Sequence, residues 1–126
     1  MIVEIRVGGI RREAEFYEDI APVTVETIRR CLPVKGYANR WGDEIYFETG
    51  IVVETEENLK EIVEIGDIAY WLPGRAICIF FGKTPVSDEE IRPASPVNVF
   101  GKVKGDLESF KKVDDGEEVE IKLLKD

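Results

Sequence analysis

The stretch Gly66–Pro85, GDIAYWLPGRAICIFFGKTP, constrains the fold of this chain more than any other part of the sequence. Its two apolar runs, Ile68–Leu72 and Ala76–Phe81, flank the turn-forming triplet Pro73–Arg75 and therefore predict two β-strands joined by a tight turn. These runs carry almost no charge, although 34% of the residues in the chain are charged. Strands of this kind are buried on both faces, or line an apolar pocket with one face.

The length and the charge of the chain narrow its class and its partners. With 126 residues, of which 44% are hydrophobic, we expect one domain, residues 1–126, with its own core. The net charge of -9 argues against nucleic acid or an anionic membrane as a partner, since both need clustered positive charge. No run approaches the ~20 apolar residues of a membrane span. The N-terminal MIVEIRV carries charge within its apolar run, which indicates a strand rather than a signal peptide, and hence a cytoplasmic protein.

The residue types that are absent restrict the chemistry. The chain has no histidine, which excludes histidine-based triads, zinc sites with histidine ligands and a histidine general base. The acidic runs Glu54–Glu57 and Asp88–Glu90 lack the spacing of a hard-cation loop, and we expect no metal and no cofactor. Cys31 and Cys78 have no CxxC spacing and are interpreted as small buried side chains. The lack of glutamine beside abundant Glu, Lys and Arg is typical of a thermophile's protein.

Short strands separated by turn residues make up most of the remaining chain. Alternating or apolar runs bounded by Gly and Pro predict strands at residues 2–7, 13–17, 37–41, 43–48, 51–54, 68–72, 76–81, 97–103 and 119–124. A short helix is expected after Thr24, with Thr24 as its N-cap. Further helical turns are expected at Ser87–Glu90 and Asp106–Lys112. The pattern predicts a mainly β fold, a closed barrel whose ends are capped by two or three short helices.

Several segments resemble those of a known family. Ala21–Thr27 resembles the A-P-x-T-V-x-N-F helix entry of cyclophilins, and Val99–Val103 resembles their V-F-G-x-V strand. The segment WGDEIYF at Trp41–Phe47, together with GDIAYW and CIFFGKTP, is more similar to a small, largely uncharacterised cyclophilin-like family of bacteria and archaea. This resemblance covers the chain from about Val3 to Leu123, and it implies an eight-stranded cyclophilin-like barrel.

The resemblance also implies a reaction. Cyclophilins accelerate the cis/trans isomerisation of X-Pro bonds: an apolar pocket holds the proline, and an arginine donates hydrogen bonds to the substrate as the amide twists. Arg40 is the one arginine in the matching region, and the resemblance makes it the candidate catalytic residue. The other side chains of the cyclophilin site are replaced. Cys78 stands where the pocket phenylalanine belongs, and nothing replaces the pocket histidine.

The candidate ligand-binding residues surround the central hairpin. They are Trp41, Glu44, Tyr46, Tyr70, Trp71, Cys78 and Phe80, with Arg40 as the anchor for a carboxylate or carbonyl. Because successive residues of a strand point to opposite faces, only one of Tyr70 and Trp71 can point inward. For the aromatic side chains, a pocket and ordinary core packing both remain open. For Arg40 the alternative to a functional role is an ion pair at the barrel rim with Asp43 or Glu44. These two carboxylates are successive residues of a strand and point to opposite faces, so they cannot form a catalytic or metal-binding pair.

Three functions are consistent with these residues. The first is binding of a small molecule or an extended peptide in an aromatic-rimmed pocket. The second is weak peptidyl-prolyl isomerase activity with Arg40 as the electrostatic donor. The third rests on the resemblance alone, because cyclophilin-like barrels also form subunits of some amide- and urea-derivative hydrolases, and it predicts a partner-dependent subunit. The acidic surface and exposed aromatic side chains also allow a homodimer.

Overall fold

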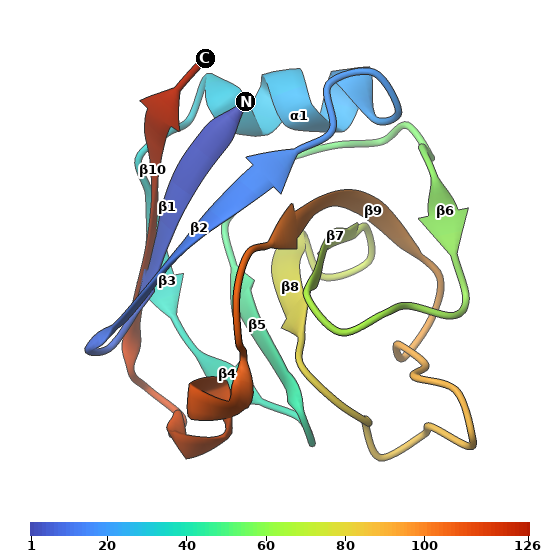
Figure 1. Ribbon diagram of the computed structural model, residues 1–126. Helices are drawn as coiled ribbons and strands as arrows, with labels where there is room; N and C mark the ends of the chain where they lie inside the picture. Colours follow the sequence, from blue (N-terminus) through green and yellow to red (C-terminus); the bar gives the residue numbers. More distant parts are fainter.

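Most of the chain forms antiparallel strands in a computed structural model that describes residues 1–126 (Figure 1). The strands are β1 Ile2–Val7, β2 Ile10–Phe16, β3 Val34–Tyr37, β4 Asn39–Arg40, β5 Glu44–Glu48, β6 Leu59–Lys60, β7 Asp67–Trp71, β8 Ala76–Phe80, β9 Val97–Val103 and β10 Glu118–Lys125. One α-helix, α1 (Pro22–Arg29), and one short 3-10 helix, η1 (Glu108–Lys112), complete the regular structure. The expectation of a mainly β fold is therefore confirmed.

The ten strands form one sheet whose hydrogen-bonded ladder is open. The strand order is β3-β10-β1-β2-β9-β7-β8-β5-β4, with β6 paired to β9 beside this path. A closed ladder of eight strands was expected, but β3 and β4 are free ends of the path. These two end strands follow each other in the chain and are separated only by Ala38, whose backbone N–H donates to the carbonyl oxygen of Glu117 at 2.8 Å. The two edges of the curled sheet are thus joined by chain continuity rather than by a ladder.

The central strands of the sheet are covered on both faces. Ile68 and Tyr70 of β7 belong to the larger core, a cluster of 26 buried residues on the inner face of the curled sheet. Ala69 of the same strand lies on the outer face, in a second cluster of 6 buried residues that includes Cys78 and Phe80 of β8. The sequence left open whether this hairpin is buried on both faces or lines an apolar pocket with one face. Side chains of both faces are buried, and part of the outer face also lines a cavity. The low charge of the two strands follows from this burial.

Helix α1 covers one end of the curled sheet (Figure 1), and it begins three residues earlier than expected. Its first residue is Pro22, which suits the first helical turn, and its N-cap is Ala21 rather than Thr24. The carboxylate of Glu57 accepts hydrogen bonds from the N–H groups of Val23 and Thr24, at 3.0 and 2.7 Å. Burial acts to raise the pKa of Glu57, but its hydrogen bonds with Thr24 and Val23 outweigh burial and lower it. A carboxylate from a distant segment therefore replaces the local cap.

The other expected helices are shorter or absent. Residues 106–112 contain the 3-10 helix η1 rather than an α-helix, and the carboxylate of Asp106 accepts a hydrogen bond from the N–H of Glu108 at 3.0 Å. Residues 87–90 contain no helix, and residues 88–90 form a bend. One α-helix and one 3-10 helix therefore stand where two or three capping helices were expected. In the segment 87–90, side-chain hydrogen bonds to the backbone compete with the helical pattern, as Ser and Asp commonly do.

The segment Ile51–Glu54, which was expected to be a strand, is not part of the sheet. The hydroxyl group of Tyr70 holds it instead: the hydroxyl donates to the carbonyl oxygen of Ile51 at 2.5 Å and accepts from the N–H of Val53 at 3.2 Å. Ile51 and Val53 remain buried in the larger core. The alternating pattern of this segment thus correctly indicates that every second side chain is buried. Its backbone, however, forms hydrogen bonds with the Tyr70 side chain rather than with a neighbouring strand.

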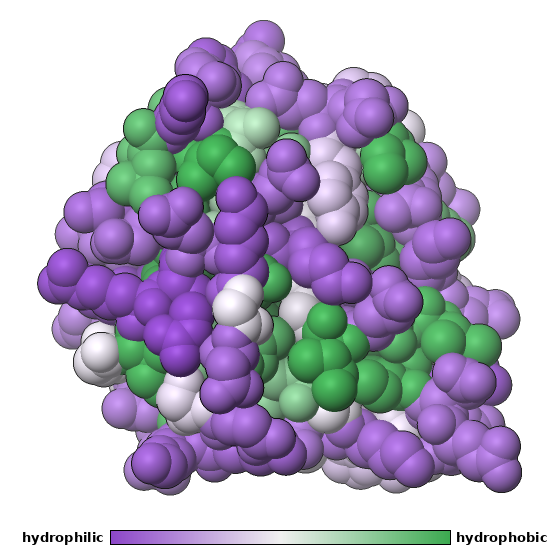
Figure 2. Space-filling view, viewed as in Figure 1, coloured by the Kyte–Doolittle hydropathy of each residue, from purple (hydrophilic) through white to green (hydrophobic).

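The surface is largely hydrophilic in the view of Figure 2, with hydrophobic side chains in separate patches, the largest over the connections that follow β6 and β8. Cys31 is exposed, contrary to the expectation of a buried thiol, because it lies in the turn that leaves α1. Neither helix has the length and apolar character that crossing a membrane requires.

Candidate functional site

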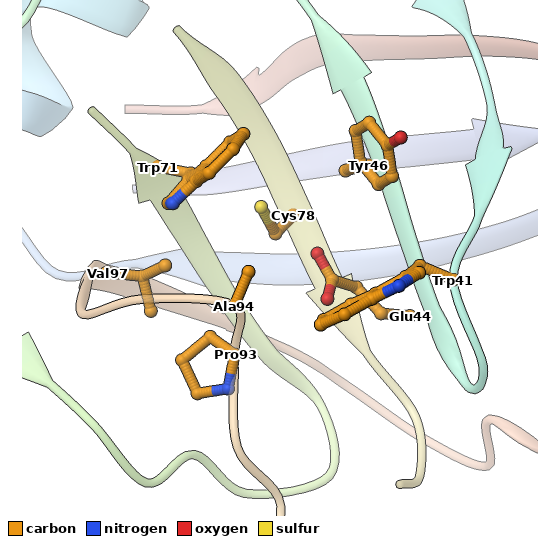
Figure 3. A pocket seen from close by; sticks show the side chains of 8 residues that line it. All are labelled: Trp41, Glu44, Tyr46, Trp71, Cys78, Pro93, Ala94 and Val97. Atoms are coloured by element: carbon orange, nitrogen blue, oxygen red, sulfur yellow. The ribbon is translucent and has the colours of Figure 1, made fainter. Parts of the chain in front are cut away.

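A cavity of about 180 Å³ lies on the outer face of the sheet, over β5, β8 and β7 (Figure 3). The residues that line it are Trp41, Glu44, Tyr46, Trp71, Cys78, Pro93, Ala94 and Val97. The lining is mostly apolar and aromatic, and Glu44 is its one charged side chain. The cavity therefore combines apolar walls with a single ionisable carboxyl group, a composition typical of small-molecule sites.

The register of the strands brings the strand-borne side chains together. Tyr46 lies opposite Cys78 in the β5–β8 pair, and Cys78 lies opposite Ala69 in the β7–β8 pair. Directly opposed residues of antiparallel strands are neighbours on one face. Glu44 and Trp71 are each two residues from this row along their own strands, and the two-residue period therefore puts them on the same face.

A tight hairpin turn places Trp41 beside Glu44. The N–H of Trp41 donates to the carbonyl oxygen of Glu44 at 3.0 Å, and the N–H of Glu44 donates to the carbonyl oxygen of Trp41 at 3.2 Å. Gly42, the first residue of this two-residue turn, has φ +61°. A positive φ at this position matches the right-handed twist of hairpin strands and is strained in residues that have a Cβ. The two hydrogen-bonded residues that flank the turn both line the cavity.

We expect Gly42→Ala to lower the free energy of unfolding by about 3 kcal/mol, because strain at positive φ adds to a steric clash. A Cβ at this position would lie 2.8 Å from the carbonyl oxygen of Lys83 and 3.0 Å from the Cα of Thr84, which are backbone atoms. Gly50→Ala is the matched control, since Gly50 has φ +73° and nothing within 4 Å of an added Cβ. It should cost about 1 kcal/mol in urea unfolding. Equal losses in the two variants would contradict the clash.

The ring of Trp71 is fixed on two sides. Its indole N–H donates to the hydroxyl oxygen of Ser95 at 2.6 Å, which ties β7 to the connection between β8 and β9. The ring also packs against Gly74 of the β7–β8 turn, where a Cβ would clash with it. Gly74 is therefore needed for the close approach of the ring to the turn, and Trp71 is held in place before any ligand enters.

The connection between β8 and β9 forms the remaining wall through Pro93 and Ala94. The hydroxyl oxygen of Ser87 accepts hydrogen bonds from the N–H of Thr84 at 2.9 Å and from the N–H of Arg92 at 3.0 Å. The hydroxyl of Thr84 in turn donates to the carbonyl oxygen of Arg92. These bonds fix the segment immediately before Pro93, although it contains no helix or strand of its own.

Glu44 is a buried carboxyl group without a full set of partners. Its relative exposure is 5%, and its Oε1 atom is the one buried side-chain polar atom in the structure that has no hydrogen-bond partner. Burial raises the pKa of Glu44 from its ordinary value of 4.5 to about 7, against the opposite effect of a hydrogen bond with the Cys78 thiol. Figure 3 shows the carboxyl between the Trp41 ring and Cys78. A buried polar atom without a hydrogen-bond partner is rare and lowers the stability of the fold, and its presence here therefore needs an explanation.

The thiol of Cys78 is not suited to act as a nucleophile. It is buried, and burial, followed by the nearby Glu44 carboxyl, raises its pKa well above the ordinary value. The reactive form of a cysteine is the thiolate, which forms when the pKa is lowered by positive charge. In this cavity Cys78 therefore acts as a small apolar wall. No group of three or more His, Cys, Asp or Glu side chains in the structure could hold a metal ion.

Arg40 lies outside the lining of the cavity. Its guanidinium donates to the carbonyl oxygens of Gly42 at 2.9 Å, Lys111 at 3.0 Å and Val113 at 2.8 Å, and forms an ion pair with Asp43 at 3.2 Å. The guanidinium also lies over the ring of Phe81, 5.1 Å from its centre. These contacts tie the β4–β5 turn to the end of η1. They match the structural alternative weighed for Arg40, an ion pair with Asp43, rather than a group that faces the cavity.

Two other predicted site residues also lie away from the cavity surface. Tyr70 is fully buried in the larger core, where its hydroxyl binds the backbone of residues 51 and 53. Phe80 is fully buried in the outer cluster and does not line the cavity. Sequence reasoning missed Pro93, Ala94 and Val97. The strand expected at residues 97–103 gave the local structure of Val97, but no periodicity indicates over which face a loop such as the one at Pro93 and Ala94 folds.

Comparison with known proteins places this chain among others of the same fold. A hypothetical protein from Archaeoglobus fulgidus with a known solution structure is 56% identical, over 97% of this chain and 93% of its own, with a TM-score of 0.83. The structure of McbB in complex with tryptophan has a TM-score of 0.74 and 17% identity, which shows the fold alone. That alignment covers 98% of this chain and 46% of McbB, so this chain spans about half its length.

No curated protein matches this chain by sequence. A model of the family described as "Cyclophilin-like" matches residues 1–122, nearly the whole chain. That match and the 56% identical archaeal relative agree with the segments that resembled the family in the sequence itself. The chain belongs to the cyclophilin-like family.

Proposed function

We propose that this protein binds a small organic molecule in the cavity lined by Trp41, Trp71 and Glu44. The observation that carries the proposal is the buried Oε1 atom of Glu44, which has no partner within the protein. A carboxyl oxygen held in an apolar cavity without a hydrogen bond costs stability that an apolar residue would not cost. A ligand that supplies the missing hydrogen bond accounts for the group.

The size of the cavity suits a ligand with a single ring. A buried apolar cavity of about 150 Å³ accommodates benzene in another protein, and the volume here is about 180 Å³. Trp41 and Trp71 present large flat surfaces of the kind that contribute much of the energy at binding sites. An extended peptide would be recognised in the same way, by inserting one ring-bearing side chain. McbB, which has a similar fold, has been solved in complex with tryptophan, and indole is therefore a rational probe.

Indole and benzyl alcohol, two neutral single-ring or fused-ring probes, test the proposal. The chain contains only two tryptophans, both of which line the cavity, so the two indole N–H signals in the NMR spectrum of ¹⁵N-labelled protein report on this site alone. We expect at least one probe to shift both signals saturably. Ala94→Phe, at an exposed position in the cavity wall, should block these shifts by filling the space. Signals that stay unchanged with these two probes, and also with the charged single-ring probes benzylamine and benzoate, would overturn the proposal.

The other functions predicted from the sequence lack a supporting contact in the site. The isomerase hypothesis needs Arg40 to donate hydrogen bonds to the substrate. The N–H groups of Arg40 donate instead to backbone carbonyl oxygens and to Asp43. A hydrolase subunit would require a partner chain, and a homodimer a second copy. Pull-down from lysate and light scattering on the purified protein measure these two properties directly.

A further inference from the structure

We propose that the ligand of this cavity is an organic ammonium ion, which donates a hydrogen bond to Oε1 of Glu44 while its apolar part lies between Trp41 and Trp71. This inference rests on the proposed function and adds the charge of the ligand to it. The observation behind it is that Oε1 is buried, has no hydrogen-bond partner and belongs to a side chain that lines the cavity.

The charges around the cavity favour a cation and disfavour an anion. Glu44 is the one charged residue of the lining, and no lysine or arginine reaches the cavity. Arg40, the nearest arginine along the chain, is held by Asp43 and three backbone carbonyls. Arg92, beside Pro93, is paired with Asp88 at 3.0 Å. A carboxylate ligand would therefore meet a like charge in a site of low dielectric, whereas an ammonium would meet an unpaired acid.

The aromatic walls favour a cation as well. Figure 3 shows Trp71 and Trp41 on opposite sides of the space above Cys78 and the Glu44 carboxyl. The negative faces of aromatic rings attract a cation, most strongly when it has left water, and tryptophan is the best of the three ring types. The bond from Trp71 to Ser95 and its packing on Gly74 hold one of these rings in place. A carboxyl group and two indole rings thus surround the position that an ammonium would occupy.

Binding of an ammonium should depend on the protonation of Glu44. The titratable groups that face it are the Cys78 thiol of β8 and the Tyr46 phenol of β5, and the covering segment contributes Pro93 and Ala94, which do not titrate. Because burial raises the pKa of Glu44 to about 7, the empty site is largely protonated below this pH. An ammonium favours the ionised form, and its affinity should therefore rise from about pH 5 to about pH 8, with release of a proton in the lower part of this range.

Three probes of nearly equal size and different charge test the inference: benzylamine (cation), benzyl alcohol (neutral) and benzoate (anion). In wild-type protein at about pH 8, we expect benzylamine to bind about tenfold more tightly than benzyl alcohol, and benzoate to bind more weakly than either. Affinities are measured from the two tryptophan N–H signals. Glu44→Gln should remove the preference for benzylamine and its pH dependence. Glu48→Gln is the matched control, since it removes the same charge from an exposed position on β5 and should leave both unchanged.

The outcomes separate this inference from the proposed function. If benzyl alcohol binds in the cavity but benzylamine binds no more tightly, or if Glu44→Gln keeps the preference, the ligand is not selected by charge, and the ammonium inference fails alone. If Glu48→Gln removes the preference as fully as Glu44→Gln does, the effect belongs to the net charge of the chain, and the inference fails as well. If benzylamine, benzyl alcohol, benzoate and indole all leave the two signals unchanged, both the inference and the proposed function fail.

Discussion

Glu44→Gln should be about 3 kcal/mol more stable than the wild type at about pH 8 and nearly equal to it at about pH 4. The pKa of Glu44 is about 7 in the folded protein, and its ordinary value of 4.5 applies to the unfolded chain. Below 4.5 the carboxyl is protonated in both states, and the protonated group has its full stabilising effect. Between 4.5 and 7 the unfolded chain loses the proton first, and the stability of the wild type falls. Glutamine resembles the protonated acid in shape and does not titrate.

Urea unfolding of the wild type and Glu44→Gln at several pH values measures this difference, because other carboxyl groups contribute equally to both proteins. Glu48→Gln again serves as the control, since it lies on the same strand but is exposed, and its pH profile should follow that of the wild type. Parallel profiles for the wild type and Glu44→Gln would mean that Glu44 ionises normally in the folded protein. That result would also remove the physical basis for the pH dependence of ligand binding.

Arg40→Ala should lower the free energy of unfolding by about 3 kcal/mol, because hydrogen bonds from a charged group are among the strongest that a side chain makes. The side chain of Arg40 is 24% exposed, and its loss would leave the carbonyl oxygens of Lys111 and Val113 without these donors. Arg40→Lys should recover little of the stability, since an ammonium cannot reproduce the fork of the guanidinium. Arg29→Ala is the control. Arg29 is exposed and paired with Asp126 across the surface, and its loss should change the stability much less than the loss of Arg40.

The same variants separate a structural from a functional role for Arg40. If the role is structural, Arg40→Lys at a temperature where it is folded should retain the indole-induced shifts of Trp41 and Trp71. A protease-coupled proline-peptide assay should likewise find no rate that disappears in Arg40→Ala. A variant with normal stability but without ligand binding or isomerase activity would restore Arg40 to the role that the resemblance implied for it.

Part of the candidate site could be predicted from the sequence. Trp41, Glu44, Tyr46, Trp71 and Cys78 were expected around a pocket, and all five line the one cavity described above. They could be grouped because they lie on hairpins next to tight turns, where the two-residue period fixes the face of each side chain. The binding of a ligand by these residues stays a prediction. Tyr70 was misplaced because alternation decides that Tyr70 and Trp71 face opposite sides, but not which of the two faces inward.

The sequence could not give contacts that depend on distant segments. Thr24 has the residue type of a helix cap, but the helix begins at Pro22, where the carboxylate of Glu57, 33 residues from Thr24, accepts hydrogen bonds from the N–H groups of Val23 and Thr24. Arg40 finds its partners near residues 111 and 113, which no local pattern brings beside it. The wall formed by Pro93 and Ala94 is likewise set by hydrogen bonds of a connection that has no periodicity.

By itself the sequence determined most of the strands and the apolar character of the central hairpin, because alternation, turn residues and the near absence of charge act over a few residues. The tertiary structure alone decided that the sheet stays open as a ladder, with the chain around Ala38 joining its edges. It alone also decided that Oε1 of Glu44 is buried without a partner, while the guanidinium of Arg40 is bonded to three backbone carbonyls and Asp43. Burial and hydrogen-bond satisfaction depend on which surfaces meet in space, and spacing along the chain does not fix that.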